Sequence, residues 1–324
     1  MLSLQECQQI INTHFNTFVL PQEPANLYDP IRYILEPDGK RIRPALVLMG
    51  CNVFSDNIED AVFPAMAVEV FHNFTLMHDD IMDQASMRRN REAVHVRWNQ
   101  NIAILSGDAM LIKAYTLLAR CPAICQAEVF ALFNRTALEV CEGQQYDMDY
   151  EQTPRVSIED YIRMVELKTA VLVAASLKTG AIIGGAAARE AELLYTFGKN
   201  IGIAFQLQDD LLDVYSDPLL FGKQTGNDIV SNKKTILLIQ ALNLAVGNTQ
   251  KELLRWIAAR TFDRNEKIMA VKTLFDTMNL EEETNAFIQI YYQQAVQSLE
   301  RLENLTGRCS ALQGFATQLL HRKK

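Results

Sequence analysis

Apolar residues recur three and four positions apart along almost the whole chain, which is the spacing of one face of an α-helix. Two helix starts carry local signals: Pro44 fits a first turn, and Ser157 followed by Asp160 resembles a capping arrangement. The sequence has no Ser/Gly-rich linker, low-complexity block or sharp repeat, so it predicts one domain over residues 1–324. Helices are expected near residues 3–19, 43–54, 59–83, 99–119, 125–148, 158–187, 190–215, 233–246, 250–260, 266–279, 282–303 and 309–321.

Few residues of this chain break helices. Its 324 residues include 14 Gly and 9 Pro, about 7% together against a usual ~12%. This composition argues against a chain of short strands and tight turns. The length fits about two domains or one bundle of long helices, and the lack of a boundary favours the bundle. We therefore expect an all-α, single-domain bundle of long helices.

Charge, cysteines and apolar runs exclude several classes of protein. Asp and Glu outnumber Lys and Arg by 39 to 31, and this net charge of −8 disfavours binding to nucleic acid. The six cysteines form no C-x-x-C pair and indicate a reduced compartment. Residues 1–20 lack the basic start of a secretory signal, and Lys178 interrupts the longest apolar run, 169–188. We expect a cytoplasmic protein without stable membrane insertion.

The chain contains the pattern D-D-x-x-D twice. The acidic residues are Asp79, Asp80 and Asp83 in the first copy and Asp209, Asp210 and Asp213 in the second. The Asp content predicts only about 0.05 copies by chance. On a helix, the first and last Asp of each copy lie one turn apart and repel, near helix C-terminal ends where the macrodipole also disfavours them. A solvated acidic helix end explains one copy more readily than two.

Bound cations would offset this repulsion. The ligands are all carboxylate oxygens with no nearby His or Cys pair, which favours Mg²⁺ over zinc. Mg²⁺ usually keeps water and shares its shell between one or two carboxylates and substrate phosphates. Two such clusters facing each other would clamp a diphosphate.

Basic residues accompany the acidic motifs. Lys40, Arg41 and Arg43 precede a helix start, where backbone N–H groups also favour an anion. The others are Arg88, Arg89, Lys168, Lys223, Lys233 and Lys234. Arg can grip phosphate oxygens in a bidentate fork, while Lys acts as a point charge. His72 lies two helical turns before Asp79 on the same face and could also reach an anion, whereas His78 and His95 are expected to be structural.

With these residues the chain resembles the trans-isoprenyl diphosphate synthases, the polyprenyl synthetase family that includes farnesyl and geranylgeranyl diphosphate synthases. One departure follows the paired arginines, where family members commonly have Gly and Pro and this chain reads Asn90-Arg91-Glu92-Ala93. The departure affects the loop rather than the arginines. The matching stretches are GKRIRP (39–44), HDDIMD (78–83) with Arg88-Arg89, Gly143-Gln144, Lys168-Thr169, FQLQDDLLD (205–213), Gly222-Lys223, Gly226-Asn227-Asp228 and NKKT (232–235).

The resemblance implies an isoprenoid synthase fold of helices around a central cavity, and a homodimer. It implies about three Mg²⁺ ions on the diphosphate of an allylic substrate. Their ligands would be Asp79, Asp83 and Asp209, supported directly or through water by Asp80, Asp210 and Asp213. The remaining contacts to that diphosphate would come from Arg88, Lys168, Lys223 and Lys233. Isopentenyl diphosphate would bind without metal through Lys40, Arg43, His72 and Arg89, and Thr169 and Gln206 would line the reacting centre.

We expect the length of the product to depend on three residues, Phe71, Phe74 and Thr75, which precede Asp79 in the sequence. Phe74 and Phe71 precede it by five and eight positions, ~7.5 Å and ~12 Å along a helix, so they would form successive floors under the growing chain. Thr75 is small and leaves a passage. Packing in the core explains either Phe alone equally well. The pattern resembles short-chain synthases that make C15 to C20 products, with geranylgeranyl diphosphate favoured over farnesyl diphosphate.

Two other functions fit part of the sequence. A class I terpene cyclase or a squalene-type synthase uses the same ionisation of a diphosphate, but such cyclases usually carry one D-D-x-x-D and lack basic residues for a second diphosphate. Lys40, Arg43 and Arg89 therefore argue against it. A noncatalytic partner subunit would have no use for two complete acidic clusters.

Overall fold

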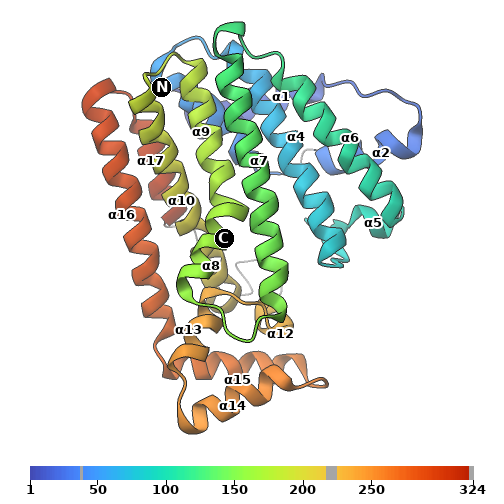
Figure 1. The fold of residues 1–324 in the computed structure, drawn as a ribbon, viewed down its shortest axis with the longest axis vertical. Helices are drawn as coiled ribbons and strands as arrows, with labels where there is room; N and C mark the ends of the chain where they lie inside the picture. Colours follow the sequence, from blue (N-terminus) through green and yellow to red (C-terminus); the bar gives the residue numbers. More distant parts are fainter. Residues whose placement is uncertain (37–38, 217–224, 321–324) are drawn as a thin grey trace. The chain divides into compact units, whose positions relative to one another are not determined.

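The structure is a computed structural model that describes residues 1–36, 39–216 and 225–320 (Figure 1). Its secondary structure is almost entirely helical, which confirms the predicted all-α class. The chain forms two compact units, and three long helices, α7 (Ala123–Gln152), α10 (Ala188–Tyr215) and α16 (Leu280–Thr306), contribute residues to both. The prediction of a single domain stays a prediction.

The first unit comprises Met1–Thr136, Leu172–Tyr195 and Leu299–Leu312. Its α4 (Glu59–Met82) packs most extensively against α6 (Gln100–Leu118) (Figure 1). Helix α4 also contacts α3 (Ile42–Phe54). Side chains cap two of its helices: Ser3 and Glu6 form a capping box at α1, and Asn99 Oδ1 accepts from the Ile102 N–H at 2.9 Å to start α6. Its complete elements are α1 (Leu4–Asn16), α2 (Ala25–Leu35), α3 (Ile42–Phe54), α4 (Glu59–Met82), β1 (Met87–Arg88), β2 (Arg91–Glu92), α5 (Val94–Arg97) and α6 (Gln100–Leu118).

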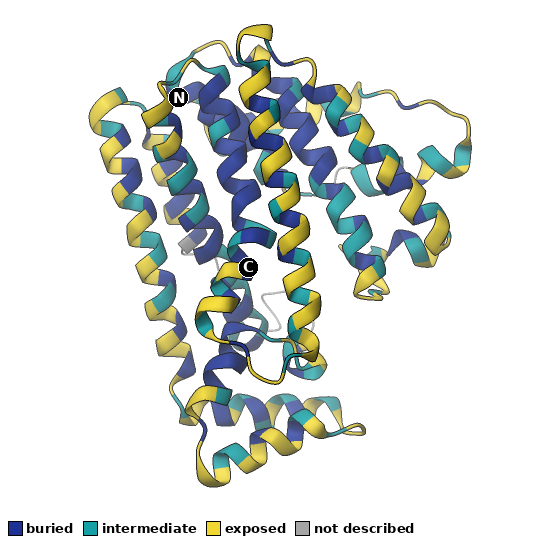
Figure 2. Cartoon of the chain, viewed as in Figure 1, coloured by how far each residue is buried: buried dark blue, intermediate teal, exposed yellow. Residues whose placement is uncertain are grey.

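Helix α4 leads from the core of this unit to the first acidic motif. Buried residues occupy most of its length, from Ala61 to Phe71, and give way to partly exposed positions in the last turns (Figure 2). The helix ends at Met82, with Asp83 as its C-cap. The apolar part of α4 therefore anchors the helix, and its polar end carries the carboxylates.

The second unit comprises the described residues of Ala137–Val171, Thr196–Ser298 and Gln313–Lys324. Its apolar core includes Leu207, Ile236, Leu253, Trp256 and Phe275. Side-chain caps again start helices: Ser157 accepts from the Asp160 N–H at 3.0 Å, as predicted, and Asp263 accepts from the Glu266 N–H at 2.9 Å. Helix α9 (Val171–Ile183) belongs to the first unit except for Val171, and α17 (Ser310–Leu320) contributes residues to both units. The further elements of the second unit are α8 (Ile158–Val165), the π-helical turn η1 (Glu166–Ala170), α12 (Asn227–Ser231), α13 (Ile236–Leu244), α14 (Gly247–Ala258) and α15 (Arg264–Thr277).

Three local features differ from the predicted helices. The helix expected over 158–187 is divided by η1 and ends at Ile183, because apolar spacing cannot reveal the extra residue of a π turn. Helix α2 was not predicted, since Pro24 and Pro30 read as breakers although Pro30 lies within the helix. The β1–β2 hairpin and α5 lie between the helices expected over 59–83 and 99–119, where no element was expected.

Among the described residues, α6 is the one helix both long and apolar enough to cross a membrane. This result rests on length and composition only. It is weak evidence for a membrane span, because core helices of soluble proteins meet the same criteria. The apolar run 169–188, considered above for a span, is instead divided between η1, α9 and α10.

Candidate active site

The first acidic motif is held by an arginine from the hairpin that follows it. Asp80 is only 1% exposed, and its Oδ1 accepts from Arg88 Nε at 2.9 Å and from Arg88 Nη2 at 2.5 Å. The same Nη2 lies 3.2 Å from Asp79 Oδ2. Burial raises the pKa of Asp80, and the Arg88 hydrogen bonds oppose that rise. The structure thus brings Asp79, Asp80 and Arg88 together, with Asp80 anchored in the protein.

The hairpin that presents the paired arginines has a two-residue turn. Arg88 pairs with Arg91, and the two residues in the turn, Arg89 and Asn90, have φ angles of 52° and 61°. A type I′ turn needs positive φ at both positions, and Asn tolerates it well. The departure from the family pattern at Asn90 is therefore accommodated by a tight turn.

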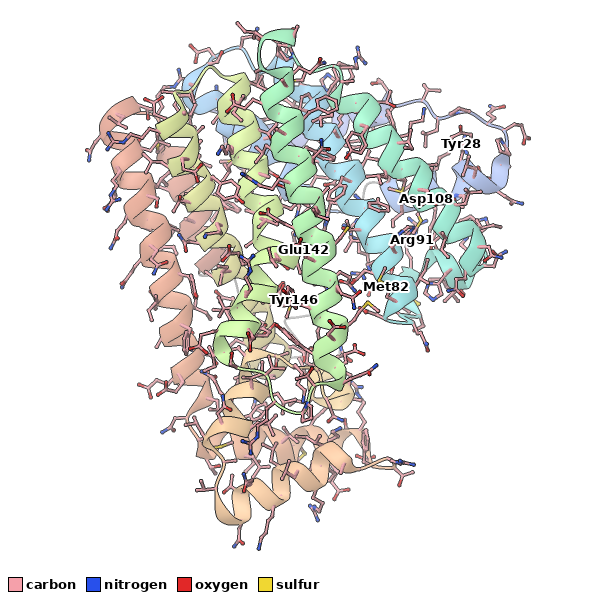
Figure 3. The ribbon with its side chains drawn as sticks, viewed as in Figure 1. Tyr28, Met82, Arg91, Asp108, Glu142 and Tyr146 are labelled. Carbon is pink, nitrogen blue, oxygen red and sulfur yellow. The ribbon has the colours of Figure 1, made fainter. Side chains whose placement is uncertain are left out.

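Residues of α2 and its C-cap contact strand β2 of this hairpin. The Tyr33 hydroxyl donates to the Glu92 carbonyl at 2.9 Å, and the Arg91 guanidinium, labelled in Figure 3, lies 3.8 Å from the Tyr33 ring centre. Arg91 also pairs with Glu36 at 2.8 Å. A cleft of about 420 Å³, partly open to solvent, is lined by Tyr33, Asn73, Asp80, Arg88 and Arg89, among others.

A cationic group surrounds His72. Arg43 Nη1 lies 3.1 Å from His72 Nε2, and because a guanidinium only donates, His72 must accept and is neutral. Burial lowers the pKa of His72 well below its ordinary value, and Arg43, Arg89 and Arg88 lower it further. Arg89 packs against Gly39, where an added Cβ would lie 3.0 Å from its Nη1. Three of the four residues predicted for isopentenyl diphosphate, Arg43, His72 and Arg89, therefore lie close together.

The remaining basic residues of this segment differ in burial. The fourth predicted residue, Lys40, is exposed. Arg41 is 6% exposed, donates to Asn12 Oδ1 at 2.9 Å and to the Leu35 carbonyl at 3.0 Å, and stacks on Phe15. Arg41 is therefore occupied in packing α1 and α2 near the start of α3.

The residues predicted as chain-length floors belong to an aromatic cluster. The Phe71 ring centre is 5.7 Å from that of Phe74 and 5.2 Å from that of Phe133 on α7. Phe71 is 1% exposed, whereas Phe74 and Thr75 are partly exposed. Phe74 thus comes first along α4 from the acidic motif, with Phe71 buried behind it.

The second acidic motif is held by neutral donors. Asp210 Oδ2 accepts a short hydrogen bond from the Tyr161 hydroxyl and one from the Ile236 N–H at 3.2 Å, and its Oδ1 accepts from Gln206 Nε2 at 3.0 Å. Burial raises the pKa of Asp210 and these donors oppose the rise. Asp213 Oδ2 accepts from the Asp228 N–H at 3.0 Å. Asp210 and Asp213 are therefore anchored as Asp80 is.

Five predicted residues of the second unit line one cleft of about 330 Å³. They are Lys168, Thr169, Gln206, Asp210 and Lys233. Lys168 and Thr169 lie in η1, and such π turns are frequent at functional sites. Lys168 Nζ pairs with Asp147 at 2.6 Å, and Thr169 Oγ1 lies 3.5 Å from Gln206 Oε1. Lys223 lies outside the described residues.

Glycine allows α7 to approach this turn. A Cβ on Gly143 would lie 2.2 Å from the backbone N of Lys168, so only Gly fits. One turn later on the same helix, Asp147 reaches Lys168. The close contact between α7 and η1 therefore fixes the position of the lysine.

Four residues contribute to the site that sequence reasoning did not single out. They are Tyr33, Asp147, Tyr161 and Asp228. Burial, together with the nearby Asp213, raises the pKa of Asp228 to about 7. Asp228 stood in a matching stretch and Asp147 lies four residues after Gly143, so both had a weak signal. Tyr33 and Tyr161 had none.

The donor set of both motifs fits Mg²⁺. Within the described ranges, no three His, Cys, Asp or Glu side chains converge on one point as a complete metal cage would require. The motifs supply only carboxylate oxygens, and His78, beside Asp79, instead contacts the Ile104 carbonyl at 3.1 Å. Mg²⁺ takes one or two protein carboxylates and completes its shell with phosphate oxygens and water, so no complete cage is needed.

Comparison with known proteins defines the family. The model of the family described as Polyprenyl synthetase matches residues 24–275. This chain belongs to the polyprenyl synthetase family. It is 40% identical to a geranylgeranyl diphosphate synthase of Methanosarcina mazei over 225 residues, 69% of each chain. It is 33% identical to one of Sulfolobus acidocaldarius over 97% of this chain and 96% of that one.

A solved structure gives the same result. The crystal structure of a geranylgeranyl pyrophosphate synthase is 42% identical, covers 100% of both chains and superposes with a TM-score of 0.91. The predicted resemblance to trans-isoprenyl diphosphate synthases is thereby confirmed, as is the all-α isoprenoid synthase fold. The chain is a prenyltransferase that elongates prenyl chains on diphosphate substrates.

Proposed function

We propose that this prenyltransferase condenses isopentenyl diphosphate with an allylic diphosphate in a Mg²⁺-dependent reaction and releases geranylgeranyl diphosphate as its main product. The alternative main product is the shorter farnesyl diphosphate. The cation set around His72 carries this proposal, because it supplies a site for a diphosphate apart from the carboxylates. A terpene cyclase has one diphosphate to bind and needs no such site.

The chain's own residues divide between two substrates in this proposal. Asp79, Asp83 and Asp209 would hold about three Mg²⁺ on the allylic diphosphate, and these ions would stabilise the charge of the leaving pyrophosphate. Arg88, Lys168, Lys223 and Lys233 would bind its oxygens. Asp80, Asp210 and Asp213 accept hydrogen bonds inside the protein, which supports a role in orienting their neighbours.

The second substrate would bind without metal, through three cations and the neutral His72. Arg43 and Arg89 would bind isopentenyl diphosphate, with the exposed Lys40 as a point charge. His72 is neutral, and because its Nε2 accepts from Arg43, its Nδ1–H would be the group that donates to the substrate. Thr169 and Gln206 would line the reacting centre. Carbon–carbon bond formation then follows when the π bond of isopentenyl diphosphate attacks the allylic cation and a proton leaves for the pyrophosphate.

The product length rests on Phe74 and Phe71. Phe74 precedes Asp79 by five residues, ~7.5 Å along α4, so it stands first beneath a growing chain. The contact of Phe71 with Phe133 closes the space behind it. Both relatives named above are called geranylgeranyl diphosphate synthases, which favours C20 over C15.

We also propose that the chain is a cytoplasmic homodimer with one domain per chain. Apolar side chains are exposed on α6 and at the start of α7, where Leu105 is 60%, Ile112 65% and Ile124 98% exposed. A second copy of the chain covering these residues would remove their apolar surface from water.

One experiment tests the proposed activity. The protein is incubated with labelled isopentenyl diphosphate, Mg²⁺ and allylic primers of five, ten and fifteen carbons, and products are separated by length. We expect elongation from at least one primer, stopping mainly at C20, and none after chelation of the metal. No elongation from any primer would instead favour a noncatalytic partner, and cyclised hydrocarbon would favour a cyclase.

A further inference from the structure

A buried lysine in the second unit has no role in the proposed reaction. Lys267, in the first turn of α15, is 1% exposed, and burial lowers its pKa. A lysine is almost never fully buried unless its ammonium is paired or hydrogen-bonded. The groups that hold its Nζ therefore indicate what the residue does.

Both hydrogen-bond acceptors of Lys267 belong to α12. Its Nζ donates to Asn232 Oδ1 at 2.7 Å and to the Val230 carbonyl at 3.2 Å, and it lies 4.3 Å from the centre of the Phe262 ring. Asn232 is the C-cap of α12, with φ of 55°, and its Nδ2 donates to the Ile257 carbonyl of α14 at 3.1 Å. Lys267 thus fixes the C-terminal end of this five-residue helix.

A second basic residue of α15 fixes the other end. Arg264 Nη2 donates to Asn227 Oδ1 at 2.7 Å and to the Thr225 carbonyl at 3.4 Å. Gly226, the N-cap, has φ of 76°, and an added Cβ would lie 2.7 Å from Ile268 Cδ1. The start of α12 therefore rests directly on α15, and a helix of five residues could not hold its shape without such support.

Helix α12 in turn holds the second acidic motif. The Asp228 N–H donates to Asp213 Oδ2 at 3.0 Å, and the Gly226 N–H donates to the Asp213 carbonyl at 2.7 Å. Lys233, assigned above to the allylic diphosphate, follows Asn232 directly, and its N–H donates to the Asp228 carbonyl at 2.9 Å. A chain of hydrogen bonds thus leads from α15 through α12 to Asp213 and Lys233.

We propose that Lys267 and Arg264 are positioning residues for the allylic diphosphate: they hold α12 so that Asp213 and Lys233 keep their places. The inference rests on the proposed function for the assignment of the substrate. Neither residue touches the substrate. Their loss should therefore affect the allylic substrate and leave isopentenyl diphosphate binding, which is assigned to residues of the first unit, unchanged.

The test uses Lys267→Met, which keeps the length of the side chain and removes its donors. Arg264 is partly exposed, so Arg264→Met serves as a second variant if Lys267→Met does not fold. Lys251→Met, on the exposed face of α14, is the control. Hydrogen exchange of residues 226–233 is measured in the protein without substrates, and KM is measured for each substrate. Exchange needs no activity, so it separates failure of this inference from failure of the proposed function.

We expect both variants to speed exchange in 226–233 and to raise KM for the allylic diphosphate roughly tenfold, since hydrogen bonds to charged groups are worth about that factor or more. KM for isopentenyl diphosphate should change less than about twofold, and Lys251→Met should resemble the wild type. The inference is overturned if exchange in 226–233 is unchanged, or if KM rises equally for both substrates.

Discussion

The two acidic motifs have the same spacing of aspartates and different surroundings. At the end of α4, Asp80 is paired with a cation, because Arg88 donates to it through two nitrogens. On α10, Asp210 takes the corresponding place and is held by a phenol, an amide and a backbone N–H, all neutral. The first motif thus has a cation hydrogen-bonded to its middle aspartate, whereas neutral groups donate to that of the second, whose pKa the charge of Lys233 lowers.

This difference gives the motifs different tasks. Arg88 would contribute to binding a diphosphate while it still pairs with Asp79 and Asp80, so we expect the first motif to bind an anion with less help from metal. The second motif lies near Asp147 and Asp228 as well, and each raises the pKa of a neighbouring group. We expect these additional carboxylates to make the second motif depend more strongly on bound cations, although Lys168 pairs with Asp147.

The largest effect is expected where a carboxylate would meet metal directly. Asp79→Asn and Asp209→Asn should each lower kcat by about 10²-fold to 10³-fold, because each removes a charged ligand from the leaving group's metal ions. Neither change should lower the melting temperature by much, since relief of repulsion within the motif offsets lost contacts such as that of Asp79 with Arg88. Steady-state kinetics and thermal unfolding measure the two effects. Activity within twofold of wild type in either variant would remove that motif from the metal site.

A smaller effect is expected for the cation of the first motif. Arg88→Met leaves Asp80 buried without its partner, and should cost about 2 kcal/mol of unfolding free energy, less than a fully buried pair because Arg88 is about a third exposed. Activity should fall about a hundredfold. Denaturant unfolding measures the first quantity and kinetics the second. Arg155→Met, at an exposed residue, is the control; an equal loss in both variants would contradict the role of the ion pair.

The second motif should tolerate the loss of one of the neutral groups that donate hydrogen bonds to Asp210. Tyr161→Phe removes one donor from Asp210 and leaves the Gln206 and Ile236 donors in place. We expect a loss of about 1 kcal/mol in unfolding free energy and about tenfold in activity. The same two assays apply. A loss as large as that of Arg88→Met would show that the two clamps are equivalent after all.

The smallest effect on rate, with a change of product, is expected at Phe74. Phe74→Ala removes the first ring beneath the chain and should shift products beyond C20 while the rate stays within about threefold. Chromatography of the labelled products by chain length measures the shift. Phe130→Ala, at a ring of the first unit that stacks on Tyr115, is the matched control. An unchanged product distribution would mean that Phe74 only packs in the core.

Sequence reasoning reached the motifs because chemistry restricts which residues can stand there. The two D-D-x-x-D copies and the paired arginines can be recognised in the sequence, because their residues occur at fixed spacing on a helix or directly after one. The fold class followed from apolar periodicity and from the scarcity of Gly and Pro. The match of the family model over residues 24–275 then confirmed the predicted family.

The partners of these motifs could not be read in the same way. Tyr161 reaches Asp210 across 49 positions of sequence, and Tyr33 reaches Glu92 across 59. Tertiary packing alone brings such pairs together. The π turn at Lys168 leaves no trace in apolar spacing, and the turn at Asn90 depends on positive φ rather than on the Gly and Pro that the family pattern led us to expect. Nothing in the sequence around Lys267 indicates that this lysine is buried.

The magnesium requirement of four variants tests the central claim most directly. Activity is titrated with Mg²⁺ for Asp79→Asn, Asp80→Asn, Asp209→Asn and Asp210→Asn. The first aspartate of each motif is assigned to metal and the second to an internal clamp, so Asp79→Asn and Asp209→Asn should need at least about tenfold more Mg²⁺ for half-maximal activity. Asp80→Asn and Asp210→Asn should keep the wild-type requirement and lose stability instead. An equal shift in all four variants would contradict the division of each motif into a ligand and an anchor.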